Sequence, residues 1–192
     1  ETGDMSSLTE VLFIERCLNL LCEGGRMAIV LPEGVLNNTK LQKVRDYVEG
    51  KAKIINITSI PQDVFIASGA TVKPSLLFFK KFTELEAKQY NTIKEQATET
   101  INEKHKEEIE SLENQLSQRG LSKEEKKELK DKLNQILQQV EDETKQEVKT
   151  KFDYEIPIVE VEKAGISTTG APIENELEPV AKEFRKYRIK NK

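Results

Sequence analysis

The segment from Glu84 to about Lys151 constrains the fold of this chain most strongly, because it contains no proline and its one glycine is Gly120. Apolar residues recur at helical spacing on both sides of that glycine, and position 112 mirrors 129 as 101 mirrors 140. The two stripes are Ile93, Ala97, Ile101, Ile109, Leu112 and Leu116, then Leu129, Leu133, Ile136, Val140 and Val148. The sequence therefore predicts an antiparallel helical hairpin with arms of about 30 residues, each roughly 45 Å long.

The residues around Gly120 fit such a turn. A glycine can adopt the left-handed conformation that ends a helix, and Ser122 with Glu125 match the S-x-x-E capping box that begins the next one. The mirror pattern places His105 opposite Ile136. Because this histidine has no Cys, His or Asp partner in the pattern, it is interpreted as a boundary residue of the stripe and not as a metal ligand.

The chain before this segment has an α/β pattern. Apolar spacing predicts one helix at about Leu8–Leu21, whose inward stripe would be Leu8, Leu12, Ile14, Cys17, Leu18 and Leu21. The Gly24-Gly25 pair ends it, and Gly24 suits the left-handed conformation there. A second helix is predicted at about Leu41–Val48, with Leu41, Val44, Tyr47 and Val48 on its apolar face. Strands are predicted at Met27–Leu31, Ile54–Ile60 and Ser75–Phe79. The first of these runs is continuously apolar, which favours a strand covered on both faces. Together these elements make half of a wound α/β sheet.

After the hairpin, the pattern predicts a strand at Ile156–Val161, a turn-rich loop at Gly165–Pro172 and a closing helix at about Leu177–Tyr187. The hairpin would thus interrupt two strands, Leu76–Phe82 and Ile156–Val161. Since the two helices leave and return at one point, we expect those strands to form an antiparallel pair.

Composition narrows the functions that are open to the chain. The net charge of -4 gives no bulk attraction to nucleic acid, so any DNA contact must depend on local geometry. Cys17 and Cys22 are expected to be reduced thiols of a cytoplasmic protein. The single histidine and the absence of a CxxC motif argue against a zinc site, and no apolar stretch approaches the roughly 20 residues that span a bilayer. The start at Glu1, with no signal-like run after it, is typical of an excised or processed chain.

Several motifs follow one another outside the hairpin. They are FIERCLNLL at 13–21, GGRMAIVLPEGVL at 24–36, the L-x-x-VR-x-Y pattern at 41–47, SIPQDVF at 59–65, GATVKPSLLF at 69–78, VEKAG at 161–165, Gly170, and NEL at 175–177. In order and spacing these motifs resemble the second half of the N-adenine DNA methylase family, which includes the modification subunits of type I restriction systems.

The resemblance implies an α/β fold class: the C-terminal half of a Rossmann-like, S-adenosylmethionine-dependent methyltransferase sheet with an inserted, coiled-coil-like helical hairpin. Residues 1–83 and 152–192 would belong to the methyltransferase domain, and residues 84–151 would form the insertion.

The family's Gly-rich donor turn and its Asn/Asp-Pro-Pro-aromatic motif do not occur in this sequence. We therefore expect no catalytic residue here, no donor bound to this chain, and no activity of the chain alone. The implied partners are DNA, a specificity subunit and, as a further candidate, a restriction subunit, with no membrane and no metal.

Four candidate DNA-contacting residues lie between the second and third predicted strands. The resemblance implies that Phe65 stacks on the extruded target adenine, because a flipped base needs such a platform. The alternative is that Phe65 fills the core behind the loop. Lys73 is either a phosphate contact or an ordinary exposed lysine, and Gln62 and Ser68 line the same loop. Glu33, at a strand end, is a weaker candidate because no partner carboxylate or base is evident.

Two other functions compete with that of an adenine-specific DNA methyltransferase. One is a non-catalytic interaction module of the specificity type, since such proteins also carry long antiparallel helices. The other is a methylase of RNA, which this half of the pattern does not separate from a DNA methylase. The segments Gly24–Pro32 and Ser59–Phe65 favour a methylase, because they belong to its sheet and are not expected of a helical spacer.

Overall fold

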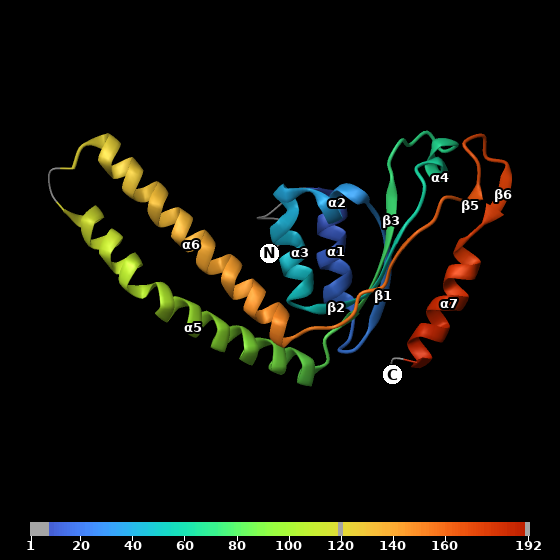
Figure 1. Cartoon of the computed structure of the whole chain (residues 1–192). Coiled ribbons are helices and arrows are strands. Elements are labelled where there is room, and N and C mark those ends of the chain that lie inside the picture. The colour runs from blue at the N-terminus through green and yellow to red at the C-terminus, as the bar shows by residue number, and fades with distance from the viewer. Residues whose placement is uncertain (1–7, 119–120, 191–192) are drawn as a thin grey trace. The chain divides into compact units, whose positions relative to one another are not determined.

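The computed structural model of the protein describes residues 8–118 and 121–190, so the turn expected at Gly120 lies outside the described residues. The chain divides into two compact units (Figure 1). One unit combines Glu1–Glu84 with Glu155–Lys192, and the other is Leu85–Tyr154.

The first unit is built on a four-stranded sheet with the strand order β1-β3-β2-β4. The strands are β1 (Arg26–Pro32), β2 (Ala52–Ser59), β3 (Pro74–Lys81) and β4 (Ile158–Glu160). Strand β3 runs antiparallel to β1 and β2, whereas β4 runs parallel to β2, so the sheet is mixed. A separate antiparallel pair is formed by β5 (Ala164–Ile166) and β6 (Pro172–Asn175). The predicted α/β class is confirmed.

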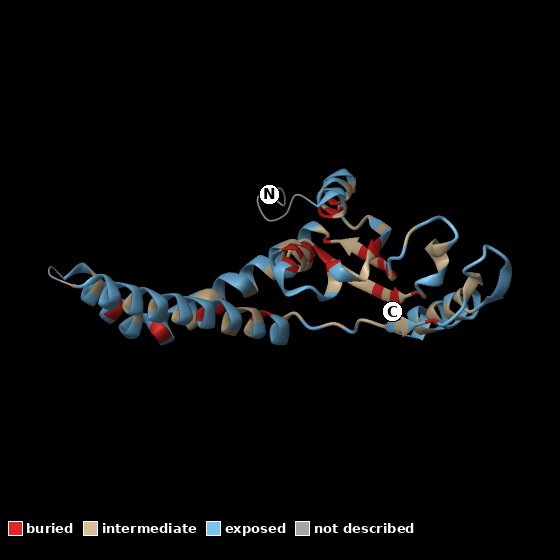
Figure 2. Ribbon diagram, turned by 90° about the horizontal axis from the view of Figure 1, so that it is seen from above, coloured by how far each residue is buried: buried red, intermediate tan, exposed pale blue. Residues whose placement is uncertain are grey.

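Helices cover one face of this sheet. They are α1 (Thr9–Leu20), α2 (Glu33–Asn37), the 3-10 helix Thr39–Leu41 and α3 (Gln42–Glu49). Their apolar faces pack with alternate residues of the strands, as the buried positions in Figure 2 show. The buried core consists of Val11, Ile14, Leu18, Leu31, Val35, Leu41, Val44, Val48, Ala52, Leu77 and Phe79. The predicted apolar face of α3 is confirmed by the burial of Leu41, Val44 and Val48.

One glycine and one lysine shape the connection from α1 to β1. Gly24 adopts φ 69°, and a Cβ there would lie 3.3 Å from Thr83 Cγ2. The predicted left-handed conformation is therefore present, although α1 itself already ends at Leu20. The Lys81 ammonium donates to the carbonyl oxygens of Leu18 and Leu21 at 2.9 and 2.8 Å, which satisfies acceptors at the end of α1.

Two expectations about burial in this unit are wrong. Strand β1 is not covered on both faces: exposed and partly buried residues alternate along it, and Val30 is 51% exposed. The reason is that β1 is an edge strand among the described residues, with helices on one face only. Leu8, which precedes α1, and Leu12 within it are exposed, while Val11 packs in the core. That helix is apolar on two sides, so periodicity could not decide which side faces inward.

The expected antiparallel pair of β3 and β4 is also wrong. Strand β3 is already hydrogen-bonded to β1 on one side and to β2 on the other, so β4 pairs with the free edge of β2. Buried side chains fix this pairing. Asn56 Nδ2 donates to the Pro157 carbonyl at 3.1 Å, and Thr58 Oγ1 donates to Asn56 Oδ1 at 2.7 Å.

The second unit contains two long helices, α5 (Glu84–Ser117) and α6 (Lys123–Lys151), which lie side by side in Figures 1 and 2. The predicted capping box begins α6: Ser122 Oγ accepts from the Glu125 N–H at 3.2 Å, and the Glu125 carboxylate accepts from the Ser122 N–H at 2.9 Å. The stripe residues buried between the helices are Ala97, Leu112, Val140 and Val148, together with His105. The other apolar stripe residues remain half-buried, because two helices cannot enclose a whole stripe.

His105 contacts Glu143, which lies about two turns beyond its mirror position Ile136. Its Nε2 lies 3.1 Å from Glu143 Oε2, and Lys104 Nζ lies 2.7 Å from the same oxygen. Side chains in a helix lean toward its N-terminus, so in an antiparallel pair the two side chains lean in opposite directions and meet beyond the Cα mirror position. The hydrogen bonds from Lys104, Gln139 and His105 lower the pKa of the Glu143 carboxyl to about 2.

The chain closes with α7 (Leu177–Lys190), of which no residue is fully buried. Its Tyr187 hydroxyl donates to the Glu155 carboxylate at 2.8 Å. Among the residues that the structure describes, no helix combines the length and apolarity that crossing a membrane requires.

Candidate functional site

The loop between β2 and β3 carries all four candidate DNA-contacting residues. It begins beyond Ser59, contains the short helix α4 (Asp63–Ile66) and ends at Lys73. The N–H groups of Ser68 and Ala70 both donate to the Phe65 carbonyl at 3.0 Å. Gly69, at φ 85°, turns the chain back toward β3. The loop is therefore a compact turn held by its own backbone.

Phe65 lies on α4 and is half-buried. It is neither a fully exposed platform nor a fully enclosed core residue. Its intermediate exposure is compatible with a base stacking on the ring.

The neighbouring polar residues of the loop differ in their contacts. Gln62 is exposed, and its Nε2 donates across the loop to the Thr71 carbonyl at 2.8 Å. Ser68 is exposed just after α4. The turn between β5 and β6 lies beside this loop, since a Cβ on Gly170 would lie 3.6 Å from the Cβ of Ala67.

Lys73, at the end of the loop, forms ion pairs with two carboxylates. Its Nζ lies 2.9 Å from Glu160 Oε1 and 3.7 Å from Glu33 Oε2. The hydrogen bond to Glu160 is the main cause of a raised pKa of the Lys73 ammonium, with Glu33 adding to it. The side chain is 38% exposed, so solvent screens these pairs. The sequence left open whether Lys73 is a phosphate contact or an ordinary exposed lysine, and the structure adds these two ion pairs.

Glu160 is the residue of this cluster that sequence reasoning missed. It lies beside Ser59 because β4 pairs in parallel with β2, and the expected antiparallel pairing with β3 would have placed it elsewhere. The buried Ser59 Oγ next to it has no hydrogen-bond partner among the described atoms. Glu33, the weaker candidate, has an ion-pair partner in Lys73, and its N–H donates to the Lys73 carbonyl at 2.9 Å.

Glu33, Lys73 and Glu160 form a cluster of charged side chains that could bind a charged ligand. Glu33, Lys73 and Glu160 come from the ends of β1 and β4 and the start of β3, and together carry two negative charges and one positive charge. Within the described part of the chain, no group of three or more His, Cys, Asp or Glu side chains could hold a metal ion. Lys73 ends the loop that carries the half-buried Phe65, and an ammonium and an aromatic ring are groups that can bind the phosphate and the base of a nucleotide.

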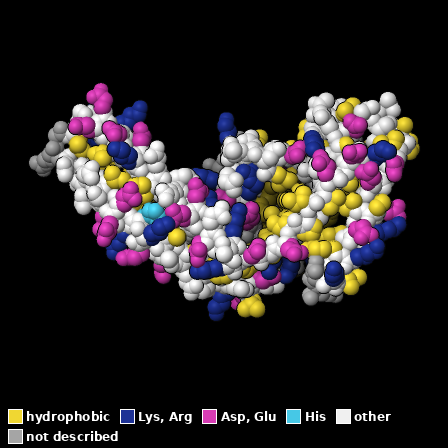
Figure 3. Space-filling model, viewed as in Figure 1, with side chains coloured by type: hydrophobic (Ala, Val, Ile, Leu, Met, Phe, Trp, Pro, Cys, Tyr) yellow, Lys and Arg dark blue, Asp and Glu magenta, His cyan; other side chains and the backbone are white. Residues whose placement is uncertain are grey.

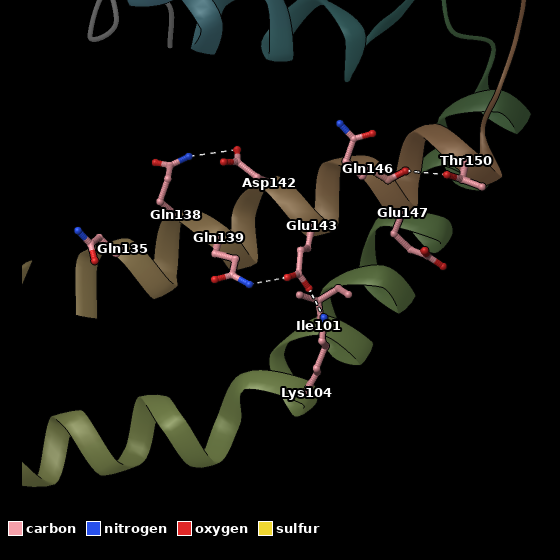
Figure 4. Close-up of a pocket in the computed structure, with 10 residues that line it drawn as sticks. All are labelled: Ile101, Lys104, Gln135, Gln138, Gln139, Asp142, Glu143, Gln146, Glu147 and Thr150. Atoms are coloured by element: carbon pink, nitrogen blue, oxygen red, sulfur yellow. Dashed lines mark hydrogen bonds and ion pairs between the residues drawn. The ribbon is translucent and has the colours of Figure 1, made fainter. Parts of the chain in front are cut away.

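The second unit carries an open groove of about 660 Å³ between α5 and α6 (Figure 4). Glutamine and carboxylate side chains of α6 line most of it, with Ile101 and Lys104 from α5. The Gln138 and Gln139 amides donate along α6 to Asp142 and Glu143. Because its polar groups bond one another and its wall is open to solvent, this groove lacks the enclosed apolar lining of a small-molecule site.

Comparison with known proteins places the chain in a family. A model of the N-6 DNA methylase family matches residues 4–164, which is most of the chain. The chain therefore belongs to the N-6 DNA methylase family, and the resemblance drawn from its motifs is confirmed. No curated protein matches the chain in a direct sequence comparison.

Enzymes of this family act on DNA and generally use S-adenosylmethionine. The turns after β1 and β2 do not fit that donor. Strand β1 runs through Pro32 directly into α2, and the first N–H after it is bonded to the Lys73 carbonyl. No glycine-rich turn with free backbone donors follows β1 or β2 to receive the donor.

Proposed function

We propose that this chain is the C-terminal part of the modification subunit of a type I restriction system, an adenine-specific, S-adenosylmethionine-dependent DNA methyltransferase. In this proposal it contributes the target-base side of the site. The observation that carries the proposal is the half-exposed Phe65 on a loop at the carboxyl end of β2, in a member of the N-6 DNA methylase family. Ligands of wound α/β sheets bind at that edge.

The surface of the first unit supports completion of the sheet by a further part of the protein. Among the described strands, β1 is hydrogen-bonded on one side only. Next to it, α1 exposes a second apolar face, with Leu12 41%, Phe13 57% and Leu20 70% exposed. An unpaired strand edge beside an apolar helix face is the surface on which a sheet adds another strand and helix. The donor site and the catalytic residues would lie in that further part.

In the proposed site, Phe65 stacks on the extruded adenine and Lys73 binds the phosphate beside it. Gln62 and Ser68 line the approach to the base. The inserted, coiled-coil-like hairpin of α5 and α6 serves as the arm that meets the specificity subunit, with the restriction subunit joining the same cytoplasmic assembly. The half-buried apolar stripe of the hairpin supports this role, since a partner helix would cover it.

The proposal predicts that the chain alone does not bind the methyl donor and does not methylate DNA. Calorimetric titration with about millimolar S-adenosylmethionine should give no saturable heat, because the donor-binding motifs are missing. A dissociation constant above about 1 mM, which is less than about 4 kcal/mol of binding free energy, would not saturate under these conditions. The intact protein should bind the donor under the same conditions and transfer methyl groups to adenine in duplex DNA. Saturable donor binding by the chain alone would contradict its proposed status as a part.

The ion pairs of Lys73 predict a gain of DNA affinity in the variant Glu160→Gln of the intact protein. Glu160 must release Lys73 before a phosphate can take its place, and its charge also repels that phosphate. We expect the slope of log K against log salt to steepen by about 0.9, with affinity about fivefold higher near 0.15 M salt. Fluorescence anisotropy over a salt series measures both quantities.

The control is Glu128→Gln, which frees Lys132 of α6, in the other unit, from a comparable ion pair of 2.8 Å. It should leave the salt dependence unchanged. An equal change in salt slope and DNA affinity in both variants would mean that net charge alone is responsible and that Lys73 does not contact a phosphate.

A further inference from the structure

Helix α7 concentrates positive charge in a chain whose net charge is -4. Its cationic residues are Lys182, Arg185, Lys186, Arg188 and Lys190, against two acidic residues, Glu178 and Glu183. From Phe184 to Lys190 the helix carries no acidic residue at all. Figure 3 shows Lys and Arg side chains on the surface formed by this last part of the chain.

The two acidic residues neutralise two of these cations. Lys182 Nζ lies 3.0 Å from Glu178, and Lys186 Nζ lies 2.6 Å from Glu183. Arg185, Arg188 and Lys190 are exposed, and none of them forms an ion pair with a residue that the structure describes. Their three charges are available to an external anion.

The opposite side of α7 holds the helix in place. Val180, Phe184 and Tyr187 form a half-buried stripe, with the rings of Phe184 and Tyr187 stacked at 6.1 Å and the Tyr187 hydroxyl bonded to Glu155. The free cations are therefore presented on an anchored helix. Favourable interaction with the helix dipole explains cations in the last turn, Arg188 and Lys190, but not Arg185.

We propose that Arg185, Arg188 and Lys190 bind the phosphate backbone of duplex DNA, outside the target-base loop; this rests on the proposed function. These residues span about 7.5 Å along the helix axis, since each residue rises about 1.5 Å. Since successive residues turn by about 100°, Arg185 lies near the middle of the outward side of α7 and Arg188 and Lys190 lie on its two flanks, from which their long side chains can reach separate phosphates. Such contacts position the protein on DNA without reading its sequence. An anionic membrane fits less well, because Ile189 is the one large apolar side chain strongly exposed on α7.

The test is the salt dependence of DNA binding by the intact protein carrying Arg185→Gln, Arg188→Gln and Lys190→Gln together. Each lost phosphate contact lowers the slope of log K against log salt by about 0.9, so the triple variant should lose up to about 2.7. Near 0.15 M salt this corresponds to roughly fivefold weaker binding for each contact. The loss should be equal on duplexes with and without the recognition site. Arginine-to-lysine replacement at 185 and 188 should preserve the slope.

The matched control replaces Lys123, Lys126 and Lys127 of α6 by glutamine. It removes the same charge from exposed positions of another helix and should leave the slope unchanged. An unchanged slope in the α7 variant, an equal loss in the control, or a loss confined to binding of anionic vesicles or of a protein subunit would overturn the proposal. These results differ from failure of the proposed function, in which the unmodified intact protein itself would neither bind nor methylate DNA.

Discussion

Replacing Phe79 with alanine is expected to destabilise the sheet unit by about 3–5 kcal/mol, the usual cost of removing a large aromatic side chain from a packed core. Phe79 is 0% exposed and lies on β3, where its neighbours in register are Met27 of β1 and Ile54 of β2. Since a domain is stable by only about 5–15 kcal/mol, the variant should be close to unfolded at physiological temperature.

Urea denaturation followed by circular dichroism measures this effect. Phe13→Ala is the matched control, because Phe13 is 57% exposed on the outer face of α1. In the chain alone it should change stability by less than about 0.5 kcal/mol. Equal destabilisation by the two substitutions would contradict the arrangement in which helices pack on one face of the sheet.

Phe65→Ala in the intact protein is expected to lower methyl transfer about five- to two-hundredfold. Stacking of a base on an aromatic side chain contributes roughly 1–3 kcal/mol, and that contribution is lost with the ring. Donor affinity should not change, because the donor is expected to bind elsewhere. Methylation per folded molecule and the fluorescence of 2-aminopurine at the target position provide the two measurements.

Two further variants separate stacking from core packing. Phe65→Trp keeps an aromatic face and should retain most of the activity. Phe65→Leu keeps an apolar side chain that can fill space, so it should preserve the melting temperature but not the activity. A large drop in the melting temperature of Phe65→Ala, with methylation per folded molecule unchanged, would show that Phe65 is a core residue.

Local signals in the sequence predicted most elements of this fold. The capping box at Ser122 and Glu125, the positive φ of Gly24 and the buried stripe of α3 depend on residues close in the chain, and all are present. Errors arose where a choice depended on distant segments. The β4 strand was assigned to β3 because the two flank the hairpin, yet both edges of β3 are occupied by β1 and β2.

The candidate site shows the same division. Phe65, Gln62, Ser68 and Lys73 could be chosen from one loop, because that loop follows a strand and matches a family motif. Glu160 could not, since it lies 87 residues from Lys73 in the chain and reaches it only through the parallel pairing of β4 with β2.

The sequence by itself determined most of the segments that form helices and strands and the family to which the chain belongs, because periodicity, capping residues and motif spacing are local properties. It missed the short elements α2, α4, β5 and β6, which are too short to show a periodicity. Only the tertiary structure decided which face of α1 is buried, which strand pairs with β4, and which carboxylates hold Lys73. Those outcomes depend on competition among segments for the same strand edges and apolar surface. The sequence of one segment does not specify its partner, because the partner depends on which strand edges other segments already occupy, as β1 and β2 occupy both edges of β3.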